Sequence, residues 1–140
     1  MRPLLLALSL LLLGAAAPAA AEEFKVVVHP DNPVAHLSQA QVSRLFLKKT
    51  LRWPEGRAVH PVEPTSPRLR ERFALSIHEK SLNAVKSYWN QLIFSGREVP
   101  PVSKSTDADV IAFVRSNPGA LGYVSASTEA HGVKTVALKD

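Results

Sequence analysis

The sequence predicts an α/β domain in which helices cover both faces of a small mixed sheet. Three observations predict this fold: a valine-rich segment suited to a buried strand, several Ser or Thr residues placed to begin helices, and the alternation of such segments along the chain. Strands that alternate with helical patterns typically form a sheet covered by helices. The 140 residues include no cysteine, so the fold must be stabilised without disulfides.

The first 21 residues have the pattern of a secretory signal peptide that is cleaved after Ala21. A positive charge at Arg2 precedes a leucine-rich run over residues 4–13, and an alanine-rich stretch follows it. The alternative is an uncleaved membrane anchor, but a span needs about 20 apolar residues, and Pro18 interrupts this stretch. We therefore expect residues 22–140 to form a single soluble domain in the periplasm or outside the cell.

The first half of the domain is expected to contain two strands and a helix. Residues 24–29 (FKVVVH) form the first strand, which should be central because three successive valines indicate burial on both faces. A helix begins at Ser38, since Gln41 can complete a capping box with it, and ends near Lys49. The alternation of apolar and polar side chains over residues 58–63 predicts the second strand.

The second half is expected to contain three helices and two strands. Ser66 followed by Pro67 is typical of a helix start, and this helix should run to about His78. Apolar residues with helical spacing predict another helix over 81–96, and Thr106 begins a third. The remaining predicted segments are a loop over 98–104, a helix end at Asn117, and strands over 121–125 and 133–138.

Composition and charge favour a binding domain over an enzyme or a nucleic-acid-binding protein. The net charge of +5 falls to +4 when the signal peptide is removed, because Arg2 is its one charged residue. This surplus suits an anionic ligand, but the basic residues are scattered among carboxylates, unlike those of dedicated nucleic-acid binders. The sequence has no thiol nucleophile, no histidine pair with metal-ligand spacing and no nucleotide-binding loop. We therefore expect a non-enzymatic domain without a metal or other cofactor.

The best candidate for a binding site is the helix start at residues 65–70 (TSPRLR). A helix N-terminus presents unpaired backbone N–H groups and a partial positive charge, both of which attract phosphate, sulfate and other oxyanions. The hydroxyls of Thr65 and Ser66 would add hydrogen-bond donors, as would the guanidinium groups of Arg68 and Arg70. The alternative is that Ser66 only caps the helix and that both arginines are solvated.

Further polar residues lie near the ends of predicted strands, namely Asp31 and Asn32 after the first, and Tyr123 and Ser125 in a later one. Open α/β sheets bind ligands beyond the carboxyl ends of their strands, so the loop of Asn32 and the helix start at Ser66 could face one crevice. This makes Asn32 a lesser candidate for the oxyanion site. The alternative is that Asp31 and Asn32 only form a turn.

Several segments carry, in chain order, the pattern of a known protein family: Leu-Phe-Leu-Lys at 45–48 with Trp53, Ser66 with Phe73, Tyr88 with Trp89, and Asn-Pro-Gly-Ala-Leu-Gly-Tyr-Val at 117–124. With this pattern, nearly the whole mature chain resembles the phosphate-binding proteins of phosphate ABC transporters, the PstS-like family. The resemblance implies one lobe of the type 2 periplasmic binding protein fold. It also implies binding of phosphate or another oxyanion in connection with ABC-type phosphate transport, with an inner-membrane ABC permease as partner.

The chain departs from this family at the ligand site and in length. The family's Arg-x-x-x-Ser-Gly-Thr motif falls on residues 62–68, and Ser66 matches its serine. Val62 replaces the arginine, Pro67 the glycine and Arg68 the threonine. The family's second lobe and its glycine-rich strand-to-helix segment have no counterpart here. An alternative function is therefore a protein-interaction or sensory module, derived from one lobe, that docks on a transporter or an envelope sensor protein. Such a module would expose an apolar or mixed patch, or form a homodimer.

Overall fold

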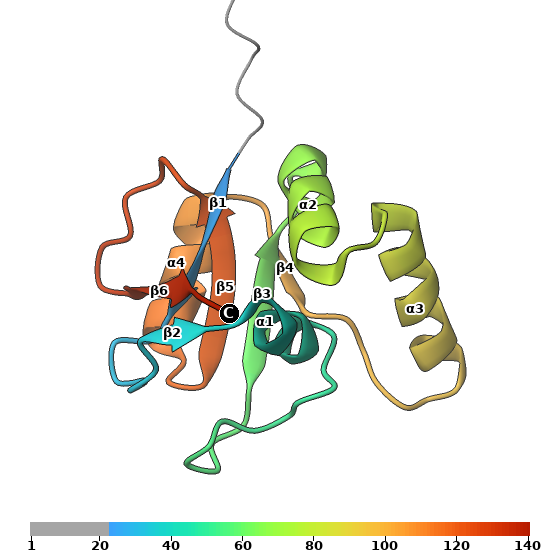
Figure 1. The fold of residues 1–140 in the computed structure, drawn as a ribbon, viewed down its shortest axis with the longest axis horizontal. Coiled ribbons are helices and arrows are strands. Elements are labelled where there is room, and N and C mark those ends of the chain that lie inside the picture. The colour runs from blue at the N-terminus through green and yellow to red at the C-terminus, as the bar shows by residue number, and fades with distance from the viewer. Residues whose placement is uncertain (1–22) are drawn as a thin grey trace, which may run out of the picture.

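A six-stranded mixed sheet forms the centre of the computed structural model, which describes residues 23–140 (Figure 1). The expected signal peptide, with its cleavage point after Ala21, lies outside the described residues. Across the sheet the strand order is β2-β6-β1-β5-β3-β4. The strands are β1 (Phe24–Val28), β2 (His36–Leu37), β3 (His60–Pro64), β4 (Val102–Lys104), β5 (Ala120–Ser125) and β6 (Lys134–Leu138).

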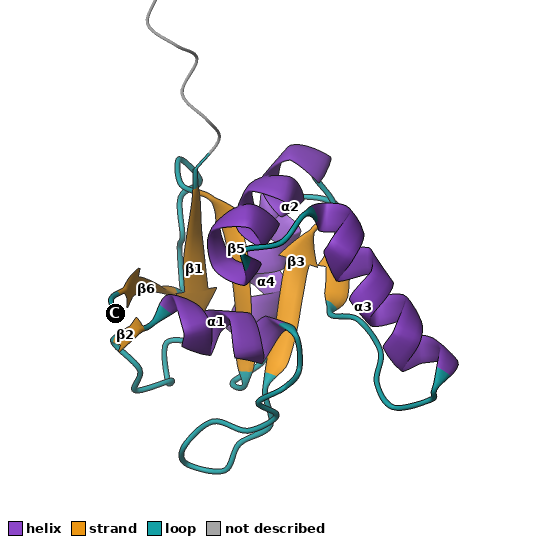
Figure 2. Cartoon of the chain, turned by 45° about the vertical axis from the view of Figure 1, so that its right-hand side comes forward, coloured by secondary structure: helices purple, strands orange, loops and turns teal. Residues whose placement is uncertain are grey.

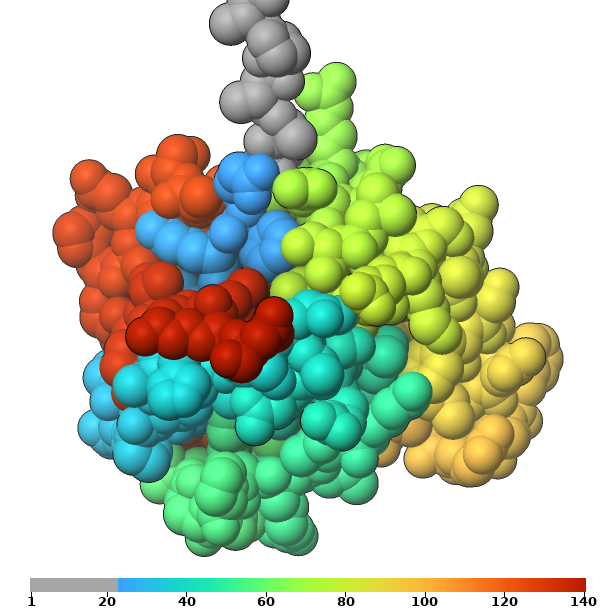
Figure 3. Space-filling model, viewed as in Figure 1, coloured from blue at the N-terminus to red at the C-terminus, as the bar shows by residue number. Residues whose placement is uncertain are grey.

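The direction of the strands divides the sheet at β1. This strand pairs antiparallel with both of its neighbours, β5 and β6. On one side of it, β3 pairs parallel with β5 and with β4. On the other side, β2 pairs parallel with β6, so the C-terminal segment, red in Figure 3, lies against the blue and cyan surface of the early chain. The inner position predicted for the strand at residues 24–29 is confirmed.

Helices cover both faces of the sheet, as the sequence predicts. On one face lie α1 (Gln39–Phe46), α2 (Pro67–Phe73) and the π-helical turn η1 (Ala74–His78), which continues α2. On the other face lies α4 (Asp107–Ser116), and α3 (Leu82–Phe94) stands beside the sheet and packs against η1 (Figure 2). None of the helices in residues 23–140 is long and apolar enough to cross a membrane.

The core is divided between the two faces of the sheet. Val26 and Val28 belong to the cluster under α1 and α2, whereas Val27 belongs to the cluster under α4. All three are buried, which confirms the predicted burial of this strand on both faces. On the first face, the ring of Phe73 from α2 stacks on the ring of Tyr123 from β5 at a centroid distance of 3.8 Å. This stack anchors α2 to the sheet.

Close packing of α4 depends on Gly122 in β5. A Cβ added there would lie 2.8 Å from Cγ1 of Val62 and 2.9 Å from Cγ1 of Val110. Real Cβ atoms do not approach other atoms so closely, so any side chain at this position would push α4 away from the sheet.

The predicted helix starts are confirmed. The hydroxyl of Ser38 accepts a hydrogen bond from the amide of Gln41 at 3.1 Å, and the Gln41 side chain accepts one from the amide of Ser38 at 2.8 Å. Ser66 and Thr106 also cap their helices. The helix predicted from Ser66 to about His78 is α2 followed without a break by η1.

Two short strands differ from the sequence prediction. Residues 102–104, predicted as part of a loop over 98–104, form β4 beside β3, so that part of the prediction is wrong. The two residues of β2 were also not predicted as a strand. Segments this short cannot show an alternating pattern, and they become strands because their backbone pairs with a distant part of the chain.

Candidate oxyanion site

The carboxyl ends of β3 and β4 lie side by side, and the chain leaves them toward opposite faces of the sheet. After β3 it enters α2 on one face, and after β4 it enters α4 on the other. The amide of Thr65 donates a hydrogen bond to the carbonyl of Lys104 at 3.0 Å, which ties the two connections together. A pair of parallel strands whose connections diverge in this way is the topological switch point at which open α/β sheets bind ligands.

The first turn of α2 retains backbone donors. The hydroxyl of Ser66 accepts a hydrogen bond from the amide of Leu69 at a long 3.4 Å, and Pro67 has no N–H to donate. Within residues 23–140, the amides of Ser66 and Arg68 have no hydrogen-bond partner. Thr65 and Arg68 are exposed, and Ser66 is half-buried. The turn is therefore open at the surface, with two amides and the side chains of Thr65, Ser66 and Arg68 as donors.

Arg70, the fourth residue predicted for this site, is held by the protein itself. Its Nε donates to the carbonyl of Pro64 at 2.8 Å. Its Nη2 donates to Oε1 of Glu63 at 2.6 Å and to the hydroxyl of Ser103 at 3.0 Å. These bonds connect α2 to β3 and β4. The structure thus gives Arg70 a role in fixing the geometry around the helix start.

Glu63, which is half-buried, and Tyr123, which is buried, complete a polar cluster with Arg70. Burial raises the pKa of Glu63, whereas Arg70 acts to lower it, so the ion pair opposes the cost of burying the carboxylate. Burial also raises the pKa of Tyr123, as does the nearby Glu63. Tyr123 therefore stays protonated and donates to Oε2 of Glu63 at 3.2 Å. Tyr123 is buried in the core, so it cannot serve as one of the polar binding groups that the sequence suggested near a strand end.

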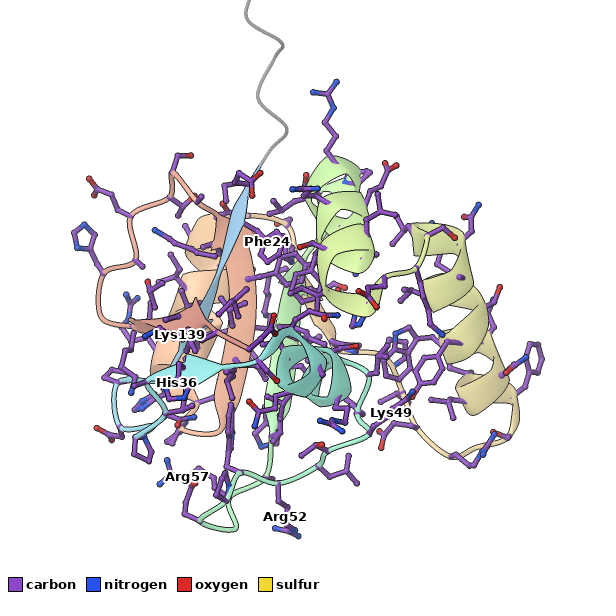
Figure 4. The ribbon with its side chains drawn as sticks, in the orientation of Figure 1. Phe24, His36, Lys49, Arg52, Arg57 and Lys139 are labelled. Carbon is purple, nitrogen blue, oxygen red and sulfur yellow. The ribbon has the colours of Figure 1, made fainter. Side chains whose placement is uncertain are left out.

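Asn32 lies at the opposite end of the sheet from Ser66, so the prediction of a crevice shared by the two residues is wrong. Because β1 is antiparallel to β5 and β5 is parallel to β3, β1 ends where β3 begins. In Figure 4, Phe24 at the start of β1 lies beside α2, whereas Arg52 and Arg57 mark the loop beyond the other end of the sheet.

The alternative reading of Asn32 as a turn former is correct. Its amide donates to the carbonyl of His29, and its Oδ1 accepts from the amide of Val34, both at 3.0 Å. Asp31 is exposed in the same turn. Ser125, by contrast, ends β5 at the same end of the sheet as Ser66, where its amide donates to Oδ2 of Asp107 at 3.0 Å.

Sequence reasoning missed Glu63, Ser103 and Lys104 as neighbours of the site. Two of them lie on β4, which was predicted as a loop, and the spacing of Glu63 and Arg70 along the chain carries no recognisable signal. The pairing of β4 with β3 is what brings them together.

No protein-family model matches the chain, and no curated protein matches it by sequence. Solved structures match it in fold. A protein from Clostridium perfringens assigned as a phosphate ABC transporter substrate-binding protein, solved with bound phosphate, superposes with a TM-score of 0.61 at 17% identity, over 84% of this chain and 45% of its own. PstS from Borrelia burgdorferi superposes with a TM-score of 0.65 at 8% identity, over 85% of this chain and 48% of its own. An ABC-type phosphate transport receptor from Vibrio cholerae superposes with a TM-score of 0.55 at 16% identity, over 82% of this chain and 45% of its own.

The chain shares the fold of phosphate-type substrate-binding proteins. The fold implied by the sequence resemblance is thereby confirmed. The chain spans about half the length of each of these proteins, in agreement with a single lobe of the substrate-binding-protein fold. Within this fold, the end of β3 and the start of α2 lie at an open surface, and the described residues include no second lobe to cover it.

Proposed function

We propose that this chain is a non-enzymatic extracytoplasmic binding domain that takes phosphate or a similar oxyanion at the start of α2, in connection with ABC-type phosphate transport. The observation that carries this proposal is the pair of unpartnered amides, at Ser66 and Arg68, beside the switch point of β3 and β4. The fold shared with phosphate-type binding proteins supports the same ligand class.

The donors at this turn suit an oxyanion. Backbone amides at a helix start point toward the ligand, and the positive end of the helix dipole favours negative charge. The hydroxyl of Thr65 and the guanidinium of Arg68 would each give a charge-assisted hydrogen bond, worth roughly 1.5–3 kcal/mol. Arg70 adds little charge of its own because Glu63 neutralises it. The expected specificity is therefore for a small tetrahedral anion held mainly by backbone and hydroxyl donors.

The open geometry implies weak capture by the isolated domain. Thr65 and Arg68 are exposed, so a bound anion would remain partly hydrated on the side away from α2. Partial hydration reduces the gain from each hydrogen bond because water competes for the same oxygens. We expect tight binding only when a partner, such as an inner-membrane ABC permease or an envelope sensor protein, covers the site.

Titration calorimetry on residues 22–140 tests the proposal, with phosphate, sulfate and a panel of other oxyanions as ligands. We expect millimolar binding of phosphate that weakens about tenfold in Arg68→Gln and in Thr65→Val, the loss expected for one charge-assisted bond. Arg57→Gln is the matched control, because Arg57 is an exposed arginine at the other end of the sheet. Absence of heat at millimolar phosphate, or an equal loss in the Arg57 variant, would count against the proposed site.

A second candidate function, the protein-interaction module, is favoured by one specific observation. Four large apolar side chains are exposed within a single stretch from the end of α3 to β4: Ile93 (48%), Phe94 (92%), Val99 (60%) and Val102 (44%). Exposed apolar side chains are typical of protein contacts where they form a contiguous patch. Light scattering across a concentration series distinguishes this function, since Phe94→Ser should abolish any self-association and leave phosphate binding unchanged.

A further inference from the structure

A cavity of about 270 Å³ lies between α3 and the helical segment of α2 and η1. α3 stands beside the sheet (Figure 2), and the cavity extends to residues of β3 and β5. Residues that line it include Glu63, Arg70, Phe73, Val85, Trp89 and Tyr123. The volume is just below the range of about 300–1,000 Å³ typical of pockets for drug-sized ligands, so it suits a smaller molecule.

The inner end of the cavity is polar and rigid. Arg70 is fixed by three hydrogen bonds from its Nε and Nη2 atoms to groups on β3 and β4. Its remaining nitrogen, Nη1, has no hydrogen-bond partner in the part of the chain that the structure describes. Glu63 is held between Arg70 and the hydroxyl of Tyr123. A guanidinium held in this way can offer a free N–H without losing conformational entropy when a ligand binds.

The charges around the cavity leave a surplus of one positive charge. Arg70 is balanced by Glu63, whereas Lys86 on α3 lines the cavity and forms no ion pair with any residue in 23–140. His78 also lines the cavity, and burial, with two nearby lysines, lowers its pKa to about 4, so its ring is uncharged near pH 7. A ligand that carries one negative charge would neutralise this surplus.

The walls between these polar groups are apolar. Phe73 from α2 and the side chains of Val85 and Trp89 from α3 face the same space. An inorganic oxyanion would lose its hydration against such walls without gaining hydrogen bonds, which is unfavourable. An aromatic or branched aliphatic group would gain by leaving water.

We propose that this cavity binds a small organic monoanion, with its carboxylate between Arg70 and Lys86 and its apolar body between α2 and α3. The site is separate from the oxyanion site at the start of α2, because it uses neither the amides of that turn nor Thr65 and Arg68. Either site can therefore exist without the other.

The indole signals of the two tryptophans in a proton–nitrogen NMR spectrum test this site, with benzoate as the probe. Trp89 lines the cavity, whereas the indole N–H of Trp53 donates to the carbonyl of Gly119 at 2.9 Å and lies outside it. Benzoate titrated to about 10 mM, some tenfold above a Kd of ~1 mM, should shift the Trp89 signal and leave that of Trp53 in place. Benzyl alcohol, which has the same ring without the charge, should shift Trp89 several-fold less at equal concentration.

Two variants locate the binding. Lys86→Gln removes the unpaired charge at an exposed position and should weaken benzoate binding about two- to five-fold, with Lys139→Gln, an exposed lysine on the far side, as the control. Val85→Trp should fill the cavity and abolish the shift, and an unchanged Trp53 signal shows that the variant is folded. The proposal is overturned if Trp89 does not shift selectively, if benzyl alcohol binds as well as benzoate, or if Lys86→Gln has no effect.

Discussion

The two ends of the sheet both carry polar loops, yet they differ in the direction of the strands that end there. At the end with Ser66, β3 and β4 finish side by side, and their helices leave toward opposite faces. At the end with Asn32, β1 finishes beside the starts of its neighbours β5 and β6, because it runs antiparallel to both. Only the first arrangement is one that α/β proteins use for ligands. Polar side chains at a strand end therefore indicate a site only when the directions of the neighbouring strands are known.

The polar groups at the two ends of the sheet also differ in whether they have hydrogen-bond partners within the protein. At one end, Asn32 uses its Oδ1 to stabilise its own turn. At the other end, the amides of Ser66 and Arg68 have no partner in the described chain. The backbone donors of Asn32's turn are thus used within the turn, whereas the start of α2 keeps two free amides while the bonds of Arg70 and the packing beneath α2 hold it in place.

The largest effect is expected where this packing is removed. Phe73→Ala deletes the ring that stacks on Tyr123 and anchors α2, so it should reduce the free energy of unfolding by about 3–5 kcal/mol. Phe94→Ala is the matched control, because this phenylalanine is 92% exposed and should change stability by less than about 0.5 kcal/mol. Urea unfolding of both variants measures the difference. Similar losses in the two would show that α2 is not held by the aromatic stack.

A pH effect is expected at the other end of the same helical segment. His78, the last residue of η1, has a pKa lowered to about 4 by burial, then by Lys80 and Lys49. The unfolded chain takes up this proton near pH 6.5, before the folded one does, so stability should fall as the pH decreases from about 6.5 to 4. The total loss is up to about 3 kcal/mol.

His78→Gln should flatten this pH dependence. Urea unfolding at several pH values, with the difference taken between the variant and the wild-type protein, removes the contribution of other groups such as Glu63. Parallel curves for the two proteins would contradict the lowered pKa. Phosphate binding near pH 7 should be the same in both, because His78 and Ser66 lie at opposite ends of the segment.

Most of the fold could be predicted because its signals are local. The capping box of Ser38 with Gln41 and the three valines of β1 depend on residues within one turn or one strand. The direction in which a strand pairs is not local. The sequence of residues 24–29 is equally compatible with either direction, and so the position of Asn32 relative to Ser66 was predicted wrongly.

The neighbours of the candidate site could be predicted least. Arg70 was expected to be a free donor, but Glu63 and Ser103 bind it, and the latter lies on a strand of three residues. The hydrogen bond from Arg70 to Ser103 depends on the pairing of β3 with β4, and Ser103 lies 33 positions from Arg70 along the chain. Propensity and periodicity describe only nearby residues, so they carry no information about such partners.

Capping variants give a smaller effect that separates a structural serine from a ligand-binding one. Ser38→Ala removes a complete capping box and should cost about 1 kcal/mol. Ser66→Ala should cost roughly half of that, because its capping bond is long, at 3.4 Å, and Pro67 favours the helix start without it. Thermal unfolding measures both losses, and calorimetry should show weaker phosphate binding in the Ser66 variant alone. Equal binding by the two variants would remove Ser66 from the proposed site.

The smallest effect is expected from a substitution at Asn32, which directly tests whether the two ends of the sheet differ in phosphate binding. Asn32→Ser keeps an oxygen that can accept from the amide of Val34 and removes an Nδ2 that is buried without a partner, so stability should change by less than about 0.5 kcal/mol. Phosphate binding should be unchanged, because Asn32 lies at the far end of the sheet, whereas Thr65→Val should weaken it. Calorimetry on the two variants decides the matter. If Asn32→Ser weakened binding as much as Thr65→Val did, the anion would be bound at the end where β1 finishes, and strand direction would not be what selects the site.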